Sequence, residues 1–174
     1  MCLSVVISRT DKQGNIIYCN STFMNVNGFK GASIINKSKS VIRHPDMSQT
    51  IYDIIWKTIS KGLPIQAIMK NKTNDNKYYW SMVEWKPQKD IEGNILSYVA
   101  EGKQAPEKVI EEIEPLYEMM HEIEKEHGME SALTYLHSFL DEKKMTYSEY
   151  LYNLTKNRGF KCLCEFVRHS IGKK

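Results

Sequence analysis

The sequence predicts an α+β fold in which a five-stranded antiparallel sheet with flanking helices is followed by a helical C-terminal subdomain. Two short runs near the N-terminus, rich in β-branched residues, flank a glycine turn and are typical of a hairpin. Three runs between residues 65 and 100 are joined by short polar turns, which indicates an antiparallel meander that the hairpin completes. After residue 104 the apolar residues recur at steps of three and four, which indicates helices.

The N-terminal hairpin is expected from Leu3–Arg9 and Ile16–Cys19, which the turn Asp11–Asn15 joins. The segment Asn20–Thr22 then offers side chains that cap helix N-termini. A short helix should therefore follow and end at Asn27–Gly28.

A longer helix is predicted from about Ser48 to Lys61, because isoleucines recur at a spacing of four and Gly62 follows as a stop signal. Beyond Pro64 the meander should begin. Its three strands are expected at Ile65–Lys72, Tyr78–Trp85 and Ile95–Ala100.

The segment Gln104–Pro106 separates the sheet from a C-terminal helical part. Apolar residues there form a heptad stripe bordered by glutamates: Val109, Ile113, Leu116, Met120 and Ile123. Pro115 predicts a kink or the start of a new helix, and Gly128 predicts a helix end. An isolated helix could not keep this stripe from water, so it must pack against the sheet, the later helices or a partner.

Two more helices are expected, at about Met129–Glu142 and after Thr146–Glu149, which has the spacing of a capping box. Their short connections favour a compact antiparallel subdomain. The predicted organisation is a sheet domain over residues 1–104, a helical subdomain over residues 105–158, and a poorly ordered tail over residues 159–174.

Composition and charge exclude several classes of protein. No apolar run approaches the roughly 18–20 residues that span a bilayer, and the N-terminus lacks a signal-peptide pattern, so a cytoplasmic protein without membrane insertion is expected. The net charge is +3, but the lysines are scattered and no nucleic-acid-binding motif accompanies them. The four cysteines contain no C-x-x-C pair and are expected to be free thiols.

Two carboxylate–histidine pairs resemble half of a di-iron site: Glu118 with His121, and Glu124 with His127. They lie six residues apart on one predicted helix and cannot converge, so a solvated acidic face is expected and no metal site. The chain contains no recognisable nucleophile–base pair, phosphate loop or pair of catalytic acids. We therefore expect no catalytic residues and a protein that is not an enzyme.

The segment Ile42–Met47 carries the most specific pattern. It reads Ile-Arg-His-Pro-Asp-Met and is similar to the Arg-His-Pro-Asp-Met-Pro signature of PAS domains in bacterial aerotaxis receptors. The surroundings match as well, including Asn20, Trp56 and the run Lys70–Lys72. The resemblance covers roughly residues 5–100 and implies a PAS fold with bound FAD that reports redox state.

The resemblance implies six cofactor-binding residues: Asn20, Arg43, His44, Asp46, Trp56 and Asn71. A flavin needs amide groups along its pyrimidine edge, an apolar slot for its ring and a cation for its pyrophosphate. The two asparagines supply amides, and Arg43 supplies a bidentate guanidinium. His44 suits donation or stacking, and Trp56 suits contact with the ring.

Each of these residues also has a structural interpretation. Asn20 stands where a helix cap is needed, and Asp46 with Gln49 has capping geometry at the start of the long helix. Arg43 can pair with Asp46, and Trp56 can belong to the core.

The chain departs from the family pattern at two positions. Ser48 replaces the proline that ends the signature. Ile65 stands where the family has a tryptophan that is implicated in flavin binding, which removes an aromatic wall. FAD should therefore be held less tightly than in relatives with tryptophan, and Ile65→Trp should raise its retention.

The function that the resemblance implies is a PAS redox or energy sensor of aerotaxis or energy taxis. Such a protein binds FAD and signals to a separate, membrane-bound chemotaxis transducer. Since no output domain is recognisable, the helical C-terminus is the expected docking or homodimer surface. The alternative is a cofactor-free PAS module for protein–protein interaction or dimerisation.

Overall fold

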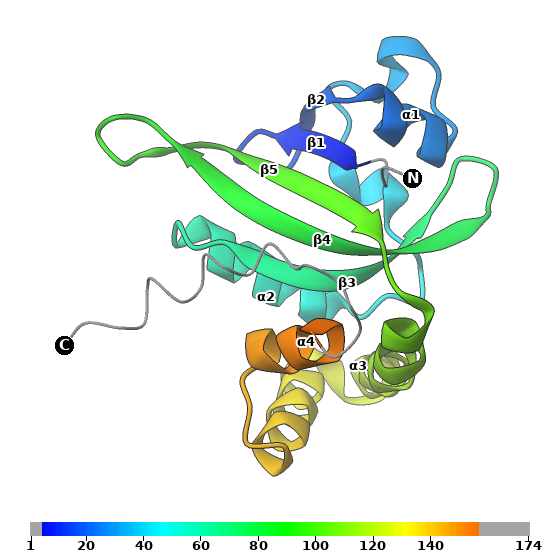
Figure 1. The fold of residues 1–174 in the computed structure, drawn as a ribbon, viewed down its shortest axis with the longest axis vertical. Coiled ribbons are helices and arrows are strands. Elements are labelled where there is room, and N and C mark those ends of the chain that lie inside the picture. Colours follow the sequence, from blue (N-terminus) through cyan, green and yellow to red (C-terminus); the bar gives the residue numbers. More distant parts are fainter. Residues whose placement is uncertain (1–4, 157–174) are drawn as a thin grey trace.

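The structure, a computed structural model, describes residues 5–156 of the chain. At its centre lies the predicted five-stranded sheet, in the order β2-β1-β5-β4-β3, with every neighbouring pair antiparallel (Figure 1). The strands are β1 (Val6–Thr10), β2 (Ile16–Cys19), β3 (Ile65–Lys72), β4 (Tyr78–Lys89) and β5 (Ile95–Gln104). The hairpin and the meander meet along the β1-β5 pair, which confirms the expected fold class.

The segments between β2 and β3 cover one face of this sheet, here called the inner face, on which Met69, Val83 and Ala100 lie. They are α1 (Ser21–Asn27), the short 3₁₀ helices η1 (Gly31–Ile34) and η2 (Lys39–Ile42), and α2 (Gln49–Ser60). The bounds of α2 agree with the predicted long helix to within one residue at each end.

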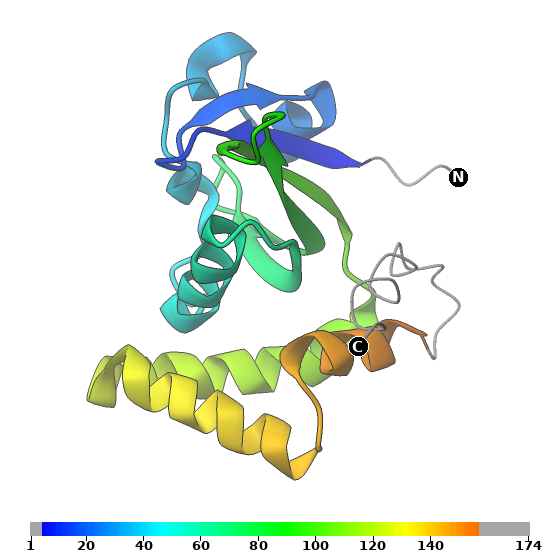
Figure 2. The same ribbon diagram turned by 90° about the vertical axis from the view of Figure 1, so that its left-hand side faces the viewer.

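The C-terminal part consists of α3 (Glu107–Glu142) and α4 (Tyr147–Lys156). Pro115 lies inside α3, where the backbone stays helical, so no new helix starts there. The chain turns at Gly128 instead, and the two halves of α3 run back along each other (Figure 2). Gly128 has φ 81° and ψ 171°, and no atom lies within 4 Å of the position of a Cβ, so the backbone conformation alone requires glycine.

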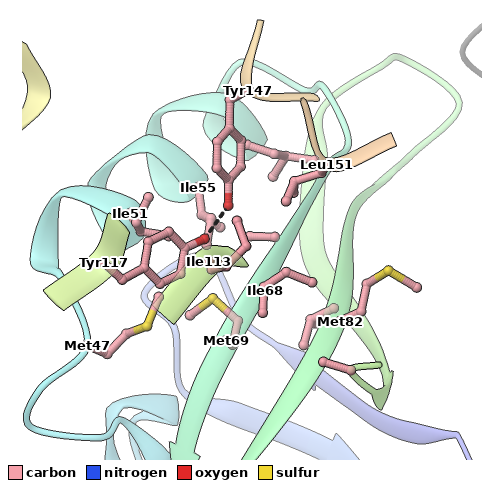
Figure 3. Close-up of a cluster of buried hydrophobic side chains, with 14 of the residues drawn as sticks. Met47, Ile51, Ile55, Ile68, Met69, Met82, Ile113, Tyr117, Tyr147 and Leu151 are labelled. Carbon is pink, nitrogen blue, oxygen red and sulfur yellow. Dashed lines mark hydrogen bonds between the residues drawn. The ribbon is translucent and has the colours of Figure 1, made fainter. Parts of the chain in front are cut away.

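One hydrophobic cluster joins the sheet, α2 and the C-terminal helices (Figure 3). Ile68 and Met82 lie in it on the outer face of the sheet, opposite to the inner-face residues of the same strands. The hydroxyls of Tyr117 and Tyr147 are buried there and hydrogen bond to each other. The predicted stripe packs into the same cluster, with four of its members buried: Val109, Ile113, Leu116 and Met120.

The predicted capping box opens α4. Thr146 Oγ1 accepts the backbone N–H of Glu149 at 3.2 Å, and the Glu149 carboxylate accepts the backbone N–H of Thr146 at 2.8 Å. The predicted tail over residues 159–174 lies outside the described residues, together with three of the four cysteines: Cys2, Cys162 and Cys164.

Candidate ligand cavity

A cavity of about 200 Å³ lies between the inner face of the sheet and the segments η2 and α2. Strands β1, β3, β4 and β5 contribute one wall, and apolar and aromatic side chains predominate in the lining. No aspartate or glutamate is among the described residues that line it. The charged groups of the cavity are therefore two cations, Lys39 and Arg43.

Three of the six predicted cofactor-binding residues line this cavity, namely Arg43, Trp56 and Asn71. The structure does not bring the other three into the lining: Asn20, His44 and Asp46. The signature segment thus forms part of the wall, and two of its residues, Ile42 and Arg43, line the cavity.

Arg43 is fixed by a bridge between its backbone and that of Asn71 on β3. Its Nη1 donates to Gln49 Oε1 at 2.7 Å, and its guanidinium lies 3.7 Å from the centre of the Tyr52 ring. Its Nε is buried without a hydrogen-bond partner among the described residues. A buried unpaired donor costs about 1–3 kcal/mol, so a ligand acceptor at this position would be stabilised.

Asn71 lies on the inner face of β3 and is buried. Its Nδ2 donates to Ser81 Oγ at 2.8 Å, which leaves Oδ1 as the acceptor that no described residue engages. Nearby, the Tyr79 hydroxyl donates to Asn27 Oδ1 at 3.0 Å. Burial raises the pKa of Tyr79 to about 12, so this hydroxyl stays protonated. The end of the cavity at Asn71 and Tyr79 is therefore polar, and its described charge is that of Arg43.

Trp56 closes the cavity beside the β1-β2 turn. Its ring meets that of Tyr98 edge to face, with 5.5 Å between the ring centres. Gly14 at the turn has φ 87°, and a Cβ there would lie 3.0 Å from the Trp56 ring. Glycine is thus needed both for the turn and for the approach of this ring.

Asn20 caps α1. Its Oδ1 accepts the backbone N–H groups of Phe23 at 2.9 Å and of Ile7 at 3.1 Å, and its Nδ2 donates to the Val5 carbonyl at 2.8 Å. These bonds engage the amide oxygen twice and one of the two Nδ2 donors, and they tie β1 to α1. The capping interpretation therefore describes this residue.

His44 and Asp46 lie toward the surface. His44 Nδ1 accepts the Asp46 backbone N–H at 3.2 Å, and its ring meets Tyr78 edge to face at 5.6 Å. Burial lowers the pKa of His44, an effect that Asp46 opposes and that Lys70 and Lys72 reinforce, so the imidazole is neutral at pH 7. The Asp46 side chain is 60% exposed.

A carboxylate of α3, not Asp46, caps α2. Glu124 Oε1 accepts the Ser48 hydroxyl at 2.6 Å and the Thr50 N–H at 2.7 Å, and Oε2 accepts the Gln49 N–H at 2.9 Å. The Glu124 side chain is 7% exposed, so the expectation of a solvated acidic face is wrong at this residue. Burial alone would raise the pKa of Glu124, but these hydrogen bonds outweigh burial and lower it.

Sequence reasoning missed Lys39, Tyr52 and Trp85, which all line the cavity. Trp85 pairs across the β3-β4 ladder with Ile65, which is buried but lies outside the lining. The neighbouring strand thus supplies an aromatic side chain to the lining beside position 65. The alternating pattern of residues 78–85 indicates an inward-facing aromatic side chain on β4. The sequence does not indicate that this side chain pairs with residue 65 on β3.

Within residues 5–156, none of the helices has the length and apolar character needed to cross a membrane. The same residues contain no group of three or more His, Cys, Asp or Glu side chains that could hold a metal ion. Cys19, on β2, is a free thiol, and burial raises its pKa.

A family model of the PAS fold matches residues 16–100. The aerotaxis receptor of Escherichia coli (strain K12) is 30% identical over 118 residues, which are 68% of this chain and 23% of the receptor. The nitrogen fixation regulatory protein of Klebsiella oxytoca is 28% identical over 97 residues, which are 56% of this chain and 20% of that protein. The chain thus spans less than a quarter of the length of these relatives.

Solved structures show the same fold. The light-state structure of the blue-light photoreceptor Aureochrome1 LOV has a TM-score of 0.57 at 21% identity and covers 61% of this chain and 85% of that chain. A light-oxygen-voltage domain structure concerned with a flavin analogue has a TM-score of 0.56 at 17% identity, with 64% and 84% covered.

Proposed function

We propose, since this chain belongs to the PAS family, that it is a cytoplasmic sensor of redox or energy state that binds FAD in the cavity. In this proposal it signals to a separate, membrane-bound chemotaxis-type transducer. One observation carries the proposal: the cavity combines aromatic walls and a buried amide with two cations and no carboxylate. A flavin needs an apolar slot, a hydrogen-bonding edge and a partner for its phosphates, and these residues offer all three.

The relatives support the same proposal. The name of the Escherichia coli relative supports a role in aerotaxis, and the light-oxygen-voltage neighbour supports a flavin in a domain of this fold.

The cavity residues have separate roles in this proposal. FAD, when bound, takes up and releases electrons. Asn71 would bond to its pyrimidine edge through the amide, and the adjacent Arg43 would donate through its unpartnered Nε to an acceptor at the same end of the flavin. The rings of Tyr52, Trp56 and Trp85, which line the cavity, would pack against the flavin and keep water from it.

Helix α2 links the cavity to the C-terminal helices. Tyr52, Ile55 and Trp56 of α2 line the cavity, while Glu124 of α3 holds the first turn of the same helix. We infer that a change in how the ligand fills the cavity moves α2, and that Glu124 passes this movement to α3. The exposed surface of α3 and α4 then serves as the docking surface for the transducer or for a second copy of the chain.

A second function, a cofactor-free PAS interaction module, is favoured by one observation: three of the six predicted cofactor-binding residues lie outside the cavity lining. We propose no enzymatic activity, because no described lining residue pairs a nucleophile with a base.

The test is to purify the full chain without added cofactor, record its visible spectrum, denature it and separate the released molecule by chromatography. The expected product is FAD. Haem, or no released cofactor together with no binding of added FAD, would overturn the flavin and leave the interaction module. Arg43→Ala should release less FAD in the same assay, because it removes a cation of the cavity. Arg9→Ala is its matched control, since Arg9 is exposed on β1 and bonds to Ser97 instead of lining the cavity.

A further inference from the structure

Lys39 stands in the cavity wall without a carboxylate beside it. It belongs to η2, and its ammonium lies 5.4 Å from the centre of the Trp85 ring. Burial lowers the pKa of Lys39 to about 7. The Lys39 side chain is half-buried, and an ammonium that loses part of its water without gaining a counter-ion destabilises a fold.

The two cations of the cavity stand at different ends. Arg43 adjoins Asn71, which bonds to Ser81 of β4, whereas Lys39 lies over Trp85, four residues further along the same strand. At about 3.3 Å per residue, these two positions on β4 are about 13 Å apart. These positions favour an elongated ligand, with one acceptor near Arg43 and another near Lys39.

We propose that Lys39 is a second cationic anchor of the cavity ligand, pairing with an acceptor or anionic group at the end of the ligand opposite to Asn71. This inference rests on the proposed function, with FAD as the ligand. The ligand oxygen offsets the loss of hydration that the ammonium suffers in the ligand-free protein. Trp85 holds the ammonium in place through a cation–π contact.

The affinity for the ligand then depends on pH. The other titratable groups in the lining are Arg43, Tyr52 and Tyr79, and burial raises the pKa of both tyrosines, so neither ionises near neutral pH. His44 lies outside the lining and is neutral at pH 7. A ligand that pairs with the charged ammonium binds with constant affinity below about pH 7 and more weakly above it, by up to about tenfold per pH unit.

The test compares Lys39→Met, which keeps the aliphatic stem and removes the charge, with Lys37→Met at an exposed position nearby. FAD affinity of the full chain is measured by titration at about pH 6 and about pH 8.5, together with the thermal midpoint of the ligand-free protein at the lower pH. Lys39→Met should weaken FAD binding at least about tenfold at the lower pH, remove the pH dependence and raise the ligand-free midpoint. The control should change none of these.

Unchanged FAD affinity, or a lower ligand-free midpoint, in Lys39→Met overturns this inference, while FAD binding by the wild type keeps the proposed function. If the wild type binds no FAD, the proposed function fails. In that case, a raised ligand-free midpoint in Lys39→Met supports Lys39 as the anchor of another anionic ligand. A lowered ligand-free midpoint overturns the role of Lys39 as an anchor. Lys39→Gln provides the same readouts if the methionine variant does not fold.

Discussion

Replacing Glu124 with glutamine tests whether α3 holds α2 in place. The carboxylate accepts three hydrogen bonds at the first turn of α2 and is 7% exposed. Glutamine keeps the shape and one acceptor oxygen, but it presents an NH₂ group to the Gln49 N–H and removes the negative charge from the helix N-terminus. Bonds to a charged group contribute about 1.5–3 kcal/mol and the helix-dipole interaction about 0.3–1 kcal/mol. We expect Glu124→Gln to lower the free energy of unfolding by about 2–3 kcal/mol.

Urea denaturation of the full chain at neutral pH measures this change, and a loss of that size should lower the thermal midpoint by about 4–12 °C. Glu126→Gln is the matched control, since Glu126 lies two residues further along α3 with a side chain that is 71% exposed. Its substitution should change the free energy of unfolding by less than about 0.5 kcal/mol.

The pH dependence gives a second readout of the same bond. Glu124 has a lowered pKa in the folded protein, so its contribution is complete above the ordinary value of 4.5 and is lost as the pH falls through the lowered value. The difference between the wild type and Glu124→Gln should therefore stay constant down to about pH 5 and shrink in more acidic solution. A variant as stable as the wild type at neutral pH, or an undiminished difference in strong acid, would refute the reasoning.

Three further predictions concern the cavity and the turn in α3. Arg43→Ala and Asn71→Ala should each weaken FAD binding about tenfold or more in titrations, with a smaller effect on ligand-free stability, because the lost bond forms in the complex. Equal losses of binding and ligand-free stability would make both residues structural. Trp85→Ala should lower the amount of flavin retained on purification. Ile65→Trp should overpack its buried position and lower the free energy of unfolding by about 1–3 kcal/mol in a denaturation assay. Higher flavin retention in Ile65→Trp would instead support the expectation from the sequence. Gly128→Ala should lower the free energy of unfolding by about 1–3 kcal/mol, because alanine is strained at φ 81°. An unchanged free energy of unfolding would show that the turn in α3 can relax.

Local patterns in the sequence were sufficient to predict most of the fold. The isoleucine spacing of α2, the capping box at Thr146 and the glycine at 128 each act within a few residues, so the printed sequence contains their whole cause. Pro115 was misleading in part, because the helix continues through it.

The site was less predictable, because its geometry depends on contacts between distant segments. Glu124 reaches Thr50 across 74 positions, and nothing near either residue marks that pairing. Lys39 has the sequence context of a surface lysine, and only the packing of η2 over β4 turns it toward Trp85. Asn20 fits both a cap and a ligand contact by residue type, so the hydrogen bonds in the structure were needed to identify it as a cap.

The tyrosine pair also bears on how the edge of the sheet is protected from pairing with other chains. β3 is an edge strand, and edge strands invite pairing with another chain. Ile68 of β3 packs in the same hydrophobic cluster as Tyr117 and Tyr147, which brings the C-terminal helices up to this strand. The opposite edge, β2, has four residues and offers a short template. The C-terminal helices thus lie beside part of the β3 edge, and detaching α3 and α4 would leave a longer edge open to aggregation.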